Sequence, residues 1–164
     1  MNYINLSRLD KPIGIYLLLW PSLLGLFLGG LNEGYIDFKN YVIVIVGAIL
    51  VRSCGCVVND IFDHKFDRLV ERTKNRPIAS GKISLKEAWM FFVILSIASF
   101  SLLLLTPPVT IKLALFFSLL ILIYPLAKRF IKAPQIILGI TFGSGSIISY
   151  SLQSDSFSLS IIIL

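Results

Sequence analysis

Charged residues are scarce in this chain. Only 15% of its 164 residues are Asp, Glu, Lys or Arg, whereas 56% are hydrophobic, and the mean hydropathy is +0.86. A soluble domain of this length would carry more charge, and several uncharged runs approach the ~20 residues that a helix needs to cross a bilayer. The composition therefore excludes an ordinary soluble domain and predicts an all-α, polytopic transmembrane helix bundle in the lipid bilayer.

Residues that build metal clusters are also scarce. Cys54 and Cys56 are the only cysteines, and His64 is the only histidine. Because no Cys/His cluster surrounds the C-x-C pair, we expect these cysteines to be small residues that pack against another helix. We expect His64 to have a supporting or surface role rather than to bind a metal. No cleavable signal peptide is expected, because the first apolar run is too long and leads directly into further spans.

Hydrophobic runs follow one another along the chain, at residues 13–31, 41–58, 88–105, 111–124, 134–150 and 157–164. The last run is short, so the sequence predicts about five spans plus the start of a sixth. Trp20-Pro21 predicts a kink or a break in the first span, and Ser84 with Glu87 predicts a capping box before the third. The 134–150 run is rich in Gly and Ser, which let helices approach closely.

Lys and Arg are unevenly distributed between the connecting segments. The N-terminal segment holds two, the 59–87 segment seven and the 128–132 segment three, whereas the other side has only Lys39 and Lys112. Because cytoplasmic loops are enriched in Lys and Arg, we expect the three basic segments, and with them the N-terminus, to face the cytoplasm. This clustering explains the net charge of +6, so no nucleic-acid partner is expected.

Polar side chains at regular spacing end the second hydrophobic run. Asn59, Asp63 and Asp67 stand four residues apart, which puts them on one face of a helix as neighbours about 5–6 Å apart. Arg52 falls on nearly the same stripe inside the run, where an ionisable residue is costly and typical of a functional site. Oxygen ligands suit a hard cation such as Mg2+, which shares its shell with substrate phosphates. The spacing therefore predicts diphosphate binding through magnesium; the alternative is a solvated acidic cap on a charged loop.

The segment from Gly55 to Asp67, together with RTKNRPIASG at 72–81, resembles the first aspartate-rich motif of the UbiA superfamily of intramembrane prenyltransferases. Further segments are similar to the same family: RLDKPIG at 8–14, LLLWP at 17–21, YPLAKR at 124–129 and PQIILGITFG at 134–143. The surroundings of the motif favour the branch that acts on 4-hydroxybenzoate in ubiquinone biosynthesis. Acceptors of the naphthoate, haem or chlorophyll type remain alternatives within the family.

This resemblance implies a reaction and a set of site residues. A polyprenyl group would pass from a polyprenyl diphosphate to 4-hydroxybenzoate, with Mg2+ as cofactor, in the bacterial inner membrane. Asn59, Asp63 and Asp67 would hold Mg2+ on the diphosphate as the catalytic residues, with Asp60 ranked lower because it points about 100° away on the helix. Candidates for substrate contact are Arg52, Lys65, Arg68, Arg72, Tyr124 and Arg129. Cytoplasmic topology alone accounts for most of the loop bases among them.

The chain departs from the family pattern in its aspartates. Family members have a second aspartate-rich motif, whereas the only aspartate after Asp67 is Asp155, in a turn expected on the opposite side of the membrane. We therefore expect residues 1–164 to be the N-terminal part of a UbiA-type membrane domain, a truncated form that binds Mg-diphosphate weakly and turns over little or not at all. The alternative is a non-catalytic membrane fragment, or a half-enzyme that pairs with a second half-chain.

Overall fold

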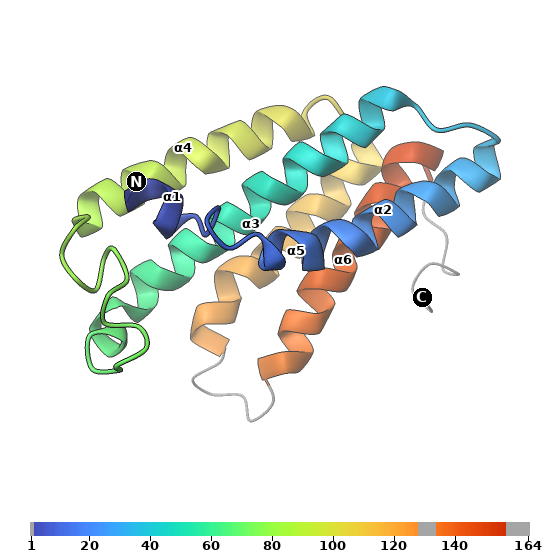
Figure 1. Cartoon of the computed structure of the whole chain (residues 1–164). Helices are drawn as coiled ribbons and strands as arrows, with labels where there is room; N and C mark the ends of the chain where they lie inside the picture. Colours follow the sequence, from blue (N-terminus) through green and yellow to red (C-terminus); the bar gives the residue numbers. More distant parts are fainter. Residues whose placement is uncertain (1, 128–133, 157–164) are drawn as a thin grey trace.

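The computed structural model describes residues 2–127 and 134–156 (Figure 1). Over these residues the elements are α1 (Asn2–Leu6), α2 (Ile13–Glu33), α3 (Phe38–Asp67), α4 (Leu85–Leu103), α5 (Pro108–Ala127) and α6 (Pro134–Ser154). The long helices lie side by side as a bundle (Figure 1), which confirms the all-α fold and the approximate number of spans. The run expected at 157–164 lies outside the described residues.

The described helices have the length and surface of membrane spans. Four of them, α2, α3, α4 and α6, are long and apolar enough to cross a bilayer, and α5 has a shorter apolar stretch over Pro108–Ile121. Large apolar side chains such as Leu31 and Phe38 are 77% and 79% exposed on the outside of the bundle, where lipid tails can cover them. The chain is therefore a multi-pass membrane protein.

Local sequence signals set the helix ends. The N–H of Ser84 donates to Glu87 Oε2 at 2.8 Å, and the N–H of Glu87 donates to Ser84 Oγ at 3.3 Å, which confirms the predicted capping box of α4. A break at Pro21 is absent, because α2 continues through this residue. The Ser22 hydroxyl donates to the Leu18 carbonyl at 2.8 Å. Pro21 has no N–H and cannot donate to the Leu17 carbonyl, so the Ser22 hydroxyl is an additional donor in the same turn of the helix.

Small residues bring α2 and α6 into close contact. A Cβ atom added at Gly25 would clash with the backbone carbonyl of Ser146, and one added at Gly29 would lie 2.9 Å from Cβ of Gln153. Gly145 of α6 in turn faces the Ser22 hydroxyl without room for a Cβ. The predicted close approach of the Gly- and Ser-rich span is thus found at Gly145. In a membrane such packing replaces the hydrophobic driving force between helices.

Gln153 ties the end of α6 to the turn between α2 and α3. The side chain is 7% exposed. Its Oε1 accepts from Asn40 Nδ2 at 3.0 Å and from the N–H of Asp37 at 3.4 Å, and its Nε2 donates to the Tyr35 carbonyl at 3.0 Å. These bonds satisfy polar groups at the end of the bundle opposite to the acidic motif.

Replacing Gln153 with alanine is expected to destabilise the bundle by about 1–3 kcal/mol, because it removes three hydrogen bonds that this buried side chain makes. Thermal unfolding of the purified chain in detergent would register this as a lower Tm. Gln135→Ala, at an exposed position of the same helix, is the matched control. An equal Tm for the two variants would show that the Gln153 bonds contribute nothing measurable.

The N-terminal segment packs onto the bundle at the end where the acidic motif lies. Leu6 is fully buried in an apolar cluster with Val57, Ile61, Ile78, Ile83 and Ala88. The ring of Tyr3 contacts that of Phe91 with centroids 5.0 Å apart, and α1 lies against the start of α4 (Figure 1). This cluster joins α1, α3, α4 and the 68–84 loop into one packed unit beside the motif.

Candidate functional site

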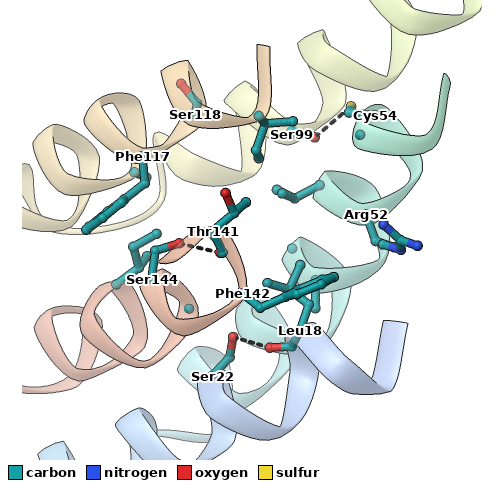
Figure 2. A pocket seen from close by; sticks show the side chains of 18 of the residues that line it. Leu18, Ser22, Arg52, Cys54, Ser99, Phe117, Ser118, Thr141, Phe142 and Ser144 are labelled. Carbon is teal, nitrogen blue, oxygen red and sulfur yellow. Dashed lines mark hydrogen bonds between the residues drawn. The ribbon is translucent and has the colours of Figure 1, made fainter. Parts of the chain in front are cut away.

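An elongated cavity of about 940 Å³ lies among the five long helices. This volume is within the range of about 300–1,000 Å³ that is usual for ligand pockets. The cavity is lined along α3 from Ile43 to Asp60, a distance of about 25 Å at the 1.5 Å helical rise per residue. Figure 2 shows lining side chains that reach the cavity from helices on all sides. The shape suits a long ligand.

The cavity has a charged end and a largely apolar body. Its charged end is lined by Arg8, Lys11, Arg52, Asn59, Asp60 and Arg76. Farther along, apolar side chains such as Ile43, Val44, Leu102 and Leu152 line the wall, with hydroxyls of Ser and Thr between them. Four cations and one carboxylate therefore face the same space. A ligand with an anionic head and a hydrocarbon tail matches this division.

Arg52 lines the cavity and carries an unsatisfied donor. Its Nε is buried and has no hydrogen-bond partner in the part of the chain that the structure describes. The Cζ atom lies 5.7 Å from the centroid of the Phe142 ring (Figure 2), and a Cβ at Gly14 would come within 2.6 Å of Nη2. Gly14 thus leaves room for the guanidinium. Because buried donors are nearly always paired, this one is suited to an anionic ligand.

Asp60 is the centre of an ion-pair network at the charged end. It is 2% exposed. Nη2 of Arg8 lies 3.1 and 3.0 Å from its two carboxylate oxygens, and Nη1 of Arg76 lies 3.1 Å from Oδ1. The same Nη1 donates to Asp67 Oδ2 at 2.8 Å. Two acids two helical turns apart therefore share one arginine, and a second arginine comes from the N-terminal segment.

The predicted acidic stripe is helical, as the four-residue spacing requires, because α3 continues to Asp67. Asn59 lines the cavity together with Arg52. Asp63 and Asp67 are buried but do not belong to the cavity lining, and Asp67 is paired with Arg76. The structure thus brings Arg52 and Asn59 to the cavity and places the two aspartates beside it. The role of the stripe as metal ligands stays a prediction.

The donor chemistry of the stripe fits Mg2+. Its side chains offer amide and carboxylate oxygens, which this hard cation prefers. The described residues contain no group of three or more His, Cys, Asp or Glu side chains placed to hold a metal by themselves. Mg2+ commonly takes only one or two carboxylates and completes its shell with waters and substrate phosphates. The stripe is therefore suited to a magnesium ion that arrives with a phosphate ligand.

The other predicted substrate contacts lie away from the cavity lining or outside the described side chains. Lys65, Arg68 and Arg72 are exposed and do not line the cavity. Arg68 Nε donates to the Ala79 carbonyl at 3.1 Å and so braces the loop after α3. The side chain of Tyr124 and the whole of Arg129 lie outside the described residues. Their contacts with substrate remain predictions.

The cysteine pair and the histidine contact other residues of the helix bundle. Cys54 Sγ lies 3.9 Å from Ser99 Oγ of α4 (Figure 2), and Gly55 faces Ile121 of α5 at 3.6 Å from an added Cβ. This segment packs against neighbouring helices as expected. His64 Nδ1 lies 2.7 Å from the Ile61 carbonyl of its own helix, and its supporting or surface role stays a prediction.

Four residues of the charged end were not singled out from the sequence as site residues: Arg8, Lys11, Asp60 and Arg76. Asp60 was ranked low because it leaves the stripe of Asn59, yet both side chains line the cavity. One signal was available, since Asp60 and Asp67 are seven residues apart and share a helix face. Arg8 gave no comparable signal, because its partner lies 52 residues away in the sequence.

Comparison with known proteins gives a consistent set of relatives. The model of the UbiA prenyltransferase family matches residues 18–164. A 4-hydroxybenzoate octaprenyltransferase from Vesicomyosocius okutanii is 49% identical over 144 residues, which are 88% of this chain and 52% of that protein. The chain thus spans about half the length of the curated relatives it matches.

Solved structures share the fold. One, described as giving structural and mechanistic insights into the biosynthesis of digeranylgeranylglyceryl phosphate synthase in membranes, has a TM-score of 0.82 at 26% identity, covering 99% of this chain and 55% of that chain. A UbiA homolog from Archaeoglobus fulgidus, solved with GPP and Mg2+, has a TM-score of 0.78 at 19% identity, covering 98% and 57%. The helix arrangement of Figure 1 is therefore similar to that of these intramembrane proteins.

Proposed function

Since this chain belongs to the UbiA prenyltransferase family, we propose that it serves the transfer of a polyprenyl group from an allylic diphosphate to 4-hydroxybenzoate, a step of ubiquinone biosynthesis. Relatives that are 41–49% identical over most of the chain are named for this activity. Because the chain spans about half of their length, residues 1–164 are proposed to form the N-terminal part of a UbiA-type membrane domain.

The observation that carries this proposal is the division of the cavity into a cationic end and an apolar body. A polyprenyl diphosphate has the same division. Lys11 and Arg52 line the cationic end together with the two arginines on Asp60, and positively charged N–H donors of this kind make strong hydrogen bonds to phosphate oxygens. The apolar body offers a site for the hydrocarbon chain.

The chemistry follows from this arrangement. Ionising an allylic diphosphate leaves a carbocation and a pyrophosphate, and cationic side chains at the site stabilise the negative charge that grows on the leaving group. The apolar wall keeps water away from the carbocation until the aromatic acceptor reacts with it. Arg52 and Lys11 would bind the diphosphate, and the wall around Leu102 and Leu152 would hold the prenyl tail.

Mg2+ is proposed as the cofactor, held by Asn59, Asp63 and Asp67 at the end of α3. When bound, it neutralises charge on the diphosphate and so makes it a better leaving group. The oxygen donors of these residues and their regular spacing on α3 support this assignment. The guanidinium of Arg76 pairs with Asp67 at 2.8 Å and neutralises part of the acidic charge at this end of α3.

The charged end is proposed to face the cytoplasm of the bacterial inner membrane. The ion pairs on Asp60 join the N-terminal segment and the loop after α3 at one end of the bundle. Those two segments carry nine of the fifteen Lys and Arg residues, which supports the positive-inside orientation. A diphosphate from the cytoplasm would then reach the cavity directly.

Transfer is tested with the chain expressed in bacterial membranes that lack their own transferase. The membranes receive Mg2+, an allylic diphosphate and labelled 4-hydroxybenzoate, with an Asp63→Ala chain as the control. Labelled prenylated product that disappears in the control supports the proposed transfer. Absence of product from a stably inserted wild-type chain contradicts transfer by this chain on its own, and product that persists in the control contradicts the assigned site.

A further inference from the structure

We infer that Asp60 is a positioning residue, which fixes Arg8 and Arg76 at the charged end of the cavity so that both guanidinium groups face the diphosphate of the substrate. The inference rests on the proposed function, since it names the residues that would hold the leaving group in place. Asp60 itself is acidic and would not contact the diphosphate. It acts through the two arginines.

The geometry of the network supports this role. Asp60 is 2% exposed, whereas the side chains of Arg8 and Arg76 are 25% and 23% exposed, and all three residues line the cavity. The contacts to Asp60 use Nη2 of Arg8 and Nη1 of Arg76. A guanidinium has five N–H donors in a fixed plane, so each arginine keeps further donors for a phosphate oxygen on its exposed side.

The backbone at Arg8 is held in an unusual conformation. Its φ angle is +59°, in the left-handed region that residues other than glycine rarely adopt. Such a conformation persists when the surrounding structure imposes it, and it is typical of functional sites. Here Leu6 anchors the preceding helix in the buried cluster, and the Arg8 side chain reaches back to Asp60. The unfavourable backbone conformation at Arg8 thus places an arginine side chain at the cavity.

The alternative is that Asp60 only neutralises two neighbouring arginines. The two explanations predict opposite changes in the affinity for diphosphate when Asp60 is replaced by asparagine. Removal of a mere counter-charge makes the charged end more positive, so diphosphate would bind equally well or more tightly. Removal of a positioning residue releases both guanidinium groups, so diphosphate would bind less tightly even though the site has gained positive charge.

The first measurement needs no substrate. The full 164-residue chain is placed in phosphatidylcholine nanodiscs, and the rates at which phenylglyoxal modifies Arg8 and Arg76 are followed by mass spectrometry. Asp60→Asn is expected to raise both rates several-fold, whereas Asp10→Asn, an exposed acid of the same segment, is expected to leave them unchanged. Unchanged rates in Asp60→Asn would overturn the inference.

The second measurement is the affinity for farnesyl thiodiphosphate, an analogue that resists ionisation, in the presence of Mg2+. Asp60→Asn is expected to raise the Kd by about tenfold, as for the loss of charge-assisted hydrogen bonds. An equal or lower Kd overturns the inference. If this variant fails to insert, Arg8→Gln serves instead, with Lys82→Gln at an exposed loop position as its control. Arg8→Gln is expected to raise the Kd for farnesyl thiodiphosphate, whereas the control is expected to leave it unchanged. An unchanged Kd in Arg8→Gln overturns the inference.

The two measurements also separate this inference from the proposed function. A wild-type chain that binds no farnesyl thiodiphosphate contradicts the proposed function, and with it the ligand named here. The modification rates of Arg8 and Arg76 still decide in that case whether Asp60 fixes the two arginines.

Discussion

Replacing Arg52 with glutamine is expected to weaken the binding of an allylic diphosphate to the membrane-embedded chain by about tenfold or more, with little effect on its fold. The buried Nε has no partner among the described residues, so this atom adds no hydrogen bond to the described part of the bundle. A phosphate oxygen would complete a charge-assisted hydrogen bond, worth about 1.5–3 kcal/mol. The substitution therefore removes more from the complex than from the free protein.

Arg52→Lys separates the charge from the shape of this side chain. Lysine keeps the positive charge but lacks the planar fork that stacks on an aromatic ring and binds phosphate oxygens in pairs. Because the guanidinium lies against the Phe142 ring, we expect an affinity between those of the wild type and Arg52→Gln. Binding is measured with farnesyl thiodiphosphate in nanodiscs.

The matched control for Arg52 is Lys112→Gln, a basic and exposed residue of α5. It carries the same change in net charge but does not line the cavity. We expect the control to bind the diphosphate like the wild type. Equal affinity of Arg52→Gln and Lys112→Gln would contradict the assignment of Arg52 to the anionic end of the ligand.

Replacing Gly25 with valine is expected to disrupt the contact between α2 and α6 and to prevent a stable bundle. Even a Cβ at this position clashes with the backbone carbonyl of Ser146, and backbone cannot move aside as a flexible side chain does. Overpacking in soluble cores typically costs about 1–3 kcal/mol. We expect a cost at the upper end or beyond, because close packing of small residues is a main source of helix association in lipid.

Gly139→Val is the matched control for Gly25→Val. Gly139 lies on α6, and a Cβ added there meets no atom within 4 Å, while the change in helix propensity from glycine to valine is the same at both sites. The amount of protease-resistant chain in membranes and the Tm in detergent distinguish the two variants. Similar values for both would contradict the close contact between α2 and α6.

Gly25→Val and Arg52→Gln should also differ in how they affect stability and diphosphate binding. Gly25→Val displaces α6, which carries Phe142 next to Arg52, so it is expected to lose both stability and diphosphate binding. Arg52→Gln is expected to lose binding alone. A stability measurement beside each binding measurement therefore separates a residue that supports the cavity from one that contacts the ligand.

The bundle could be predicted from the sequence because a chain in lipid must satisfy its backbone hydrogen bonds internally. The runs at 13–31 and 88–105 correspond to α2 and α4 within a few residues. The largest difference between a hydrophobic run and its helix is at α3, where the run ends at Val58 and the helix continues to Asp67, as the spacing of the acidic stripe predicts. Ion pairs with Arg8 and Arg76 compensate Asp60 and Asp67 in this extension, and hydropathy alone does not register such partners.

The site could be predicted only in part. Helical spacing was sufficient to bring Arg52 and Asn59 together, because both lie on α3 and line the cavity. The place of Asp60 depends on how far the cavity extends around α3, and that of Arg8 depends on the packing of Leu6. Both are consequences of tertiary structure, which the periodicity of a single helix does not contain.

The end of α3 is proposed to bind a prenyl diphosphate together with Mg2+. The most direct test is the affinity of the wild-type and Asp63→Ala chains for farnesyl thiodiphosphate in nanodiscs, measured with Mg2+ and after its removal with EDTA. Binding by the wild type is expected to weaken by about tenfold or more without Mg2+, and Asp63→Ala is expected to bind equally weakly under both conditions. Wild-type binding that is independent of Mg2+, or unchanged affinity in Asp63→Ala, would contradict this proposal.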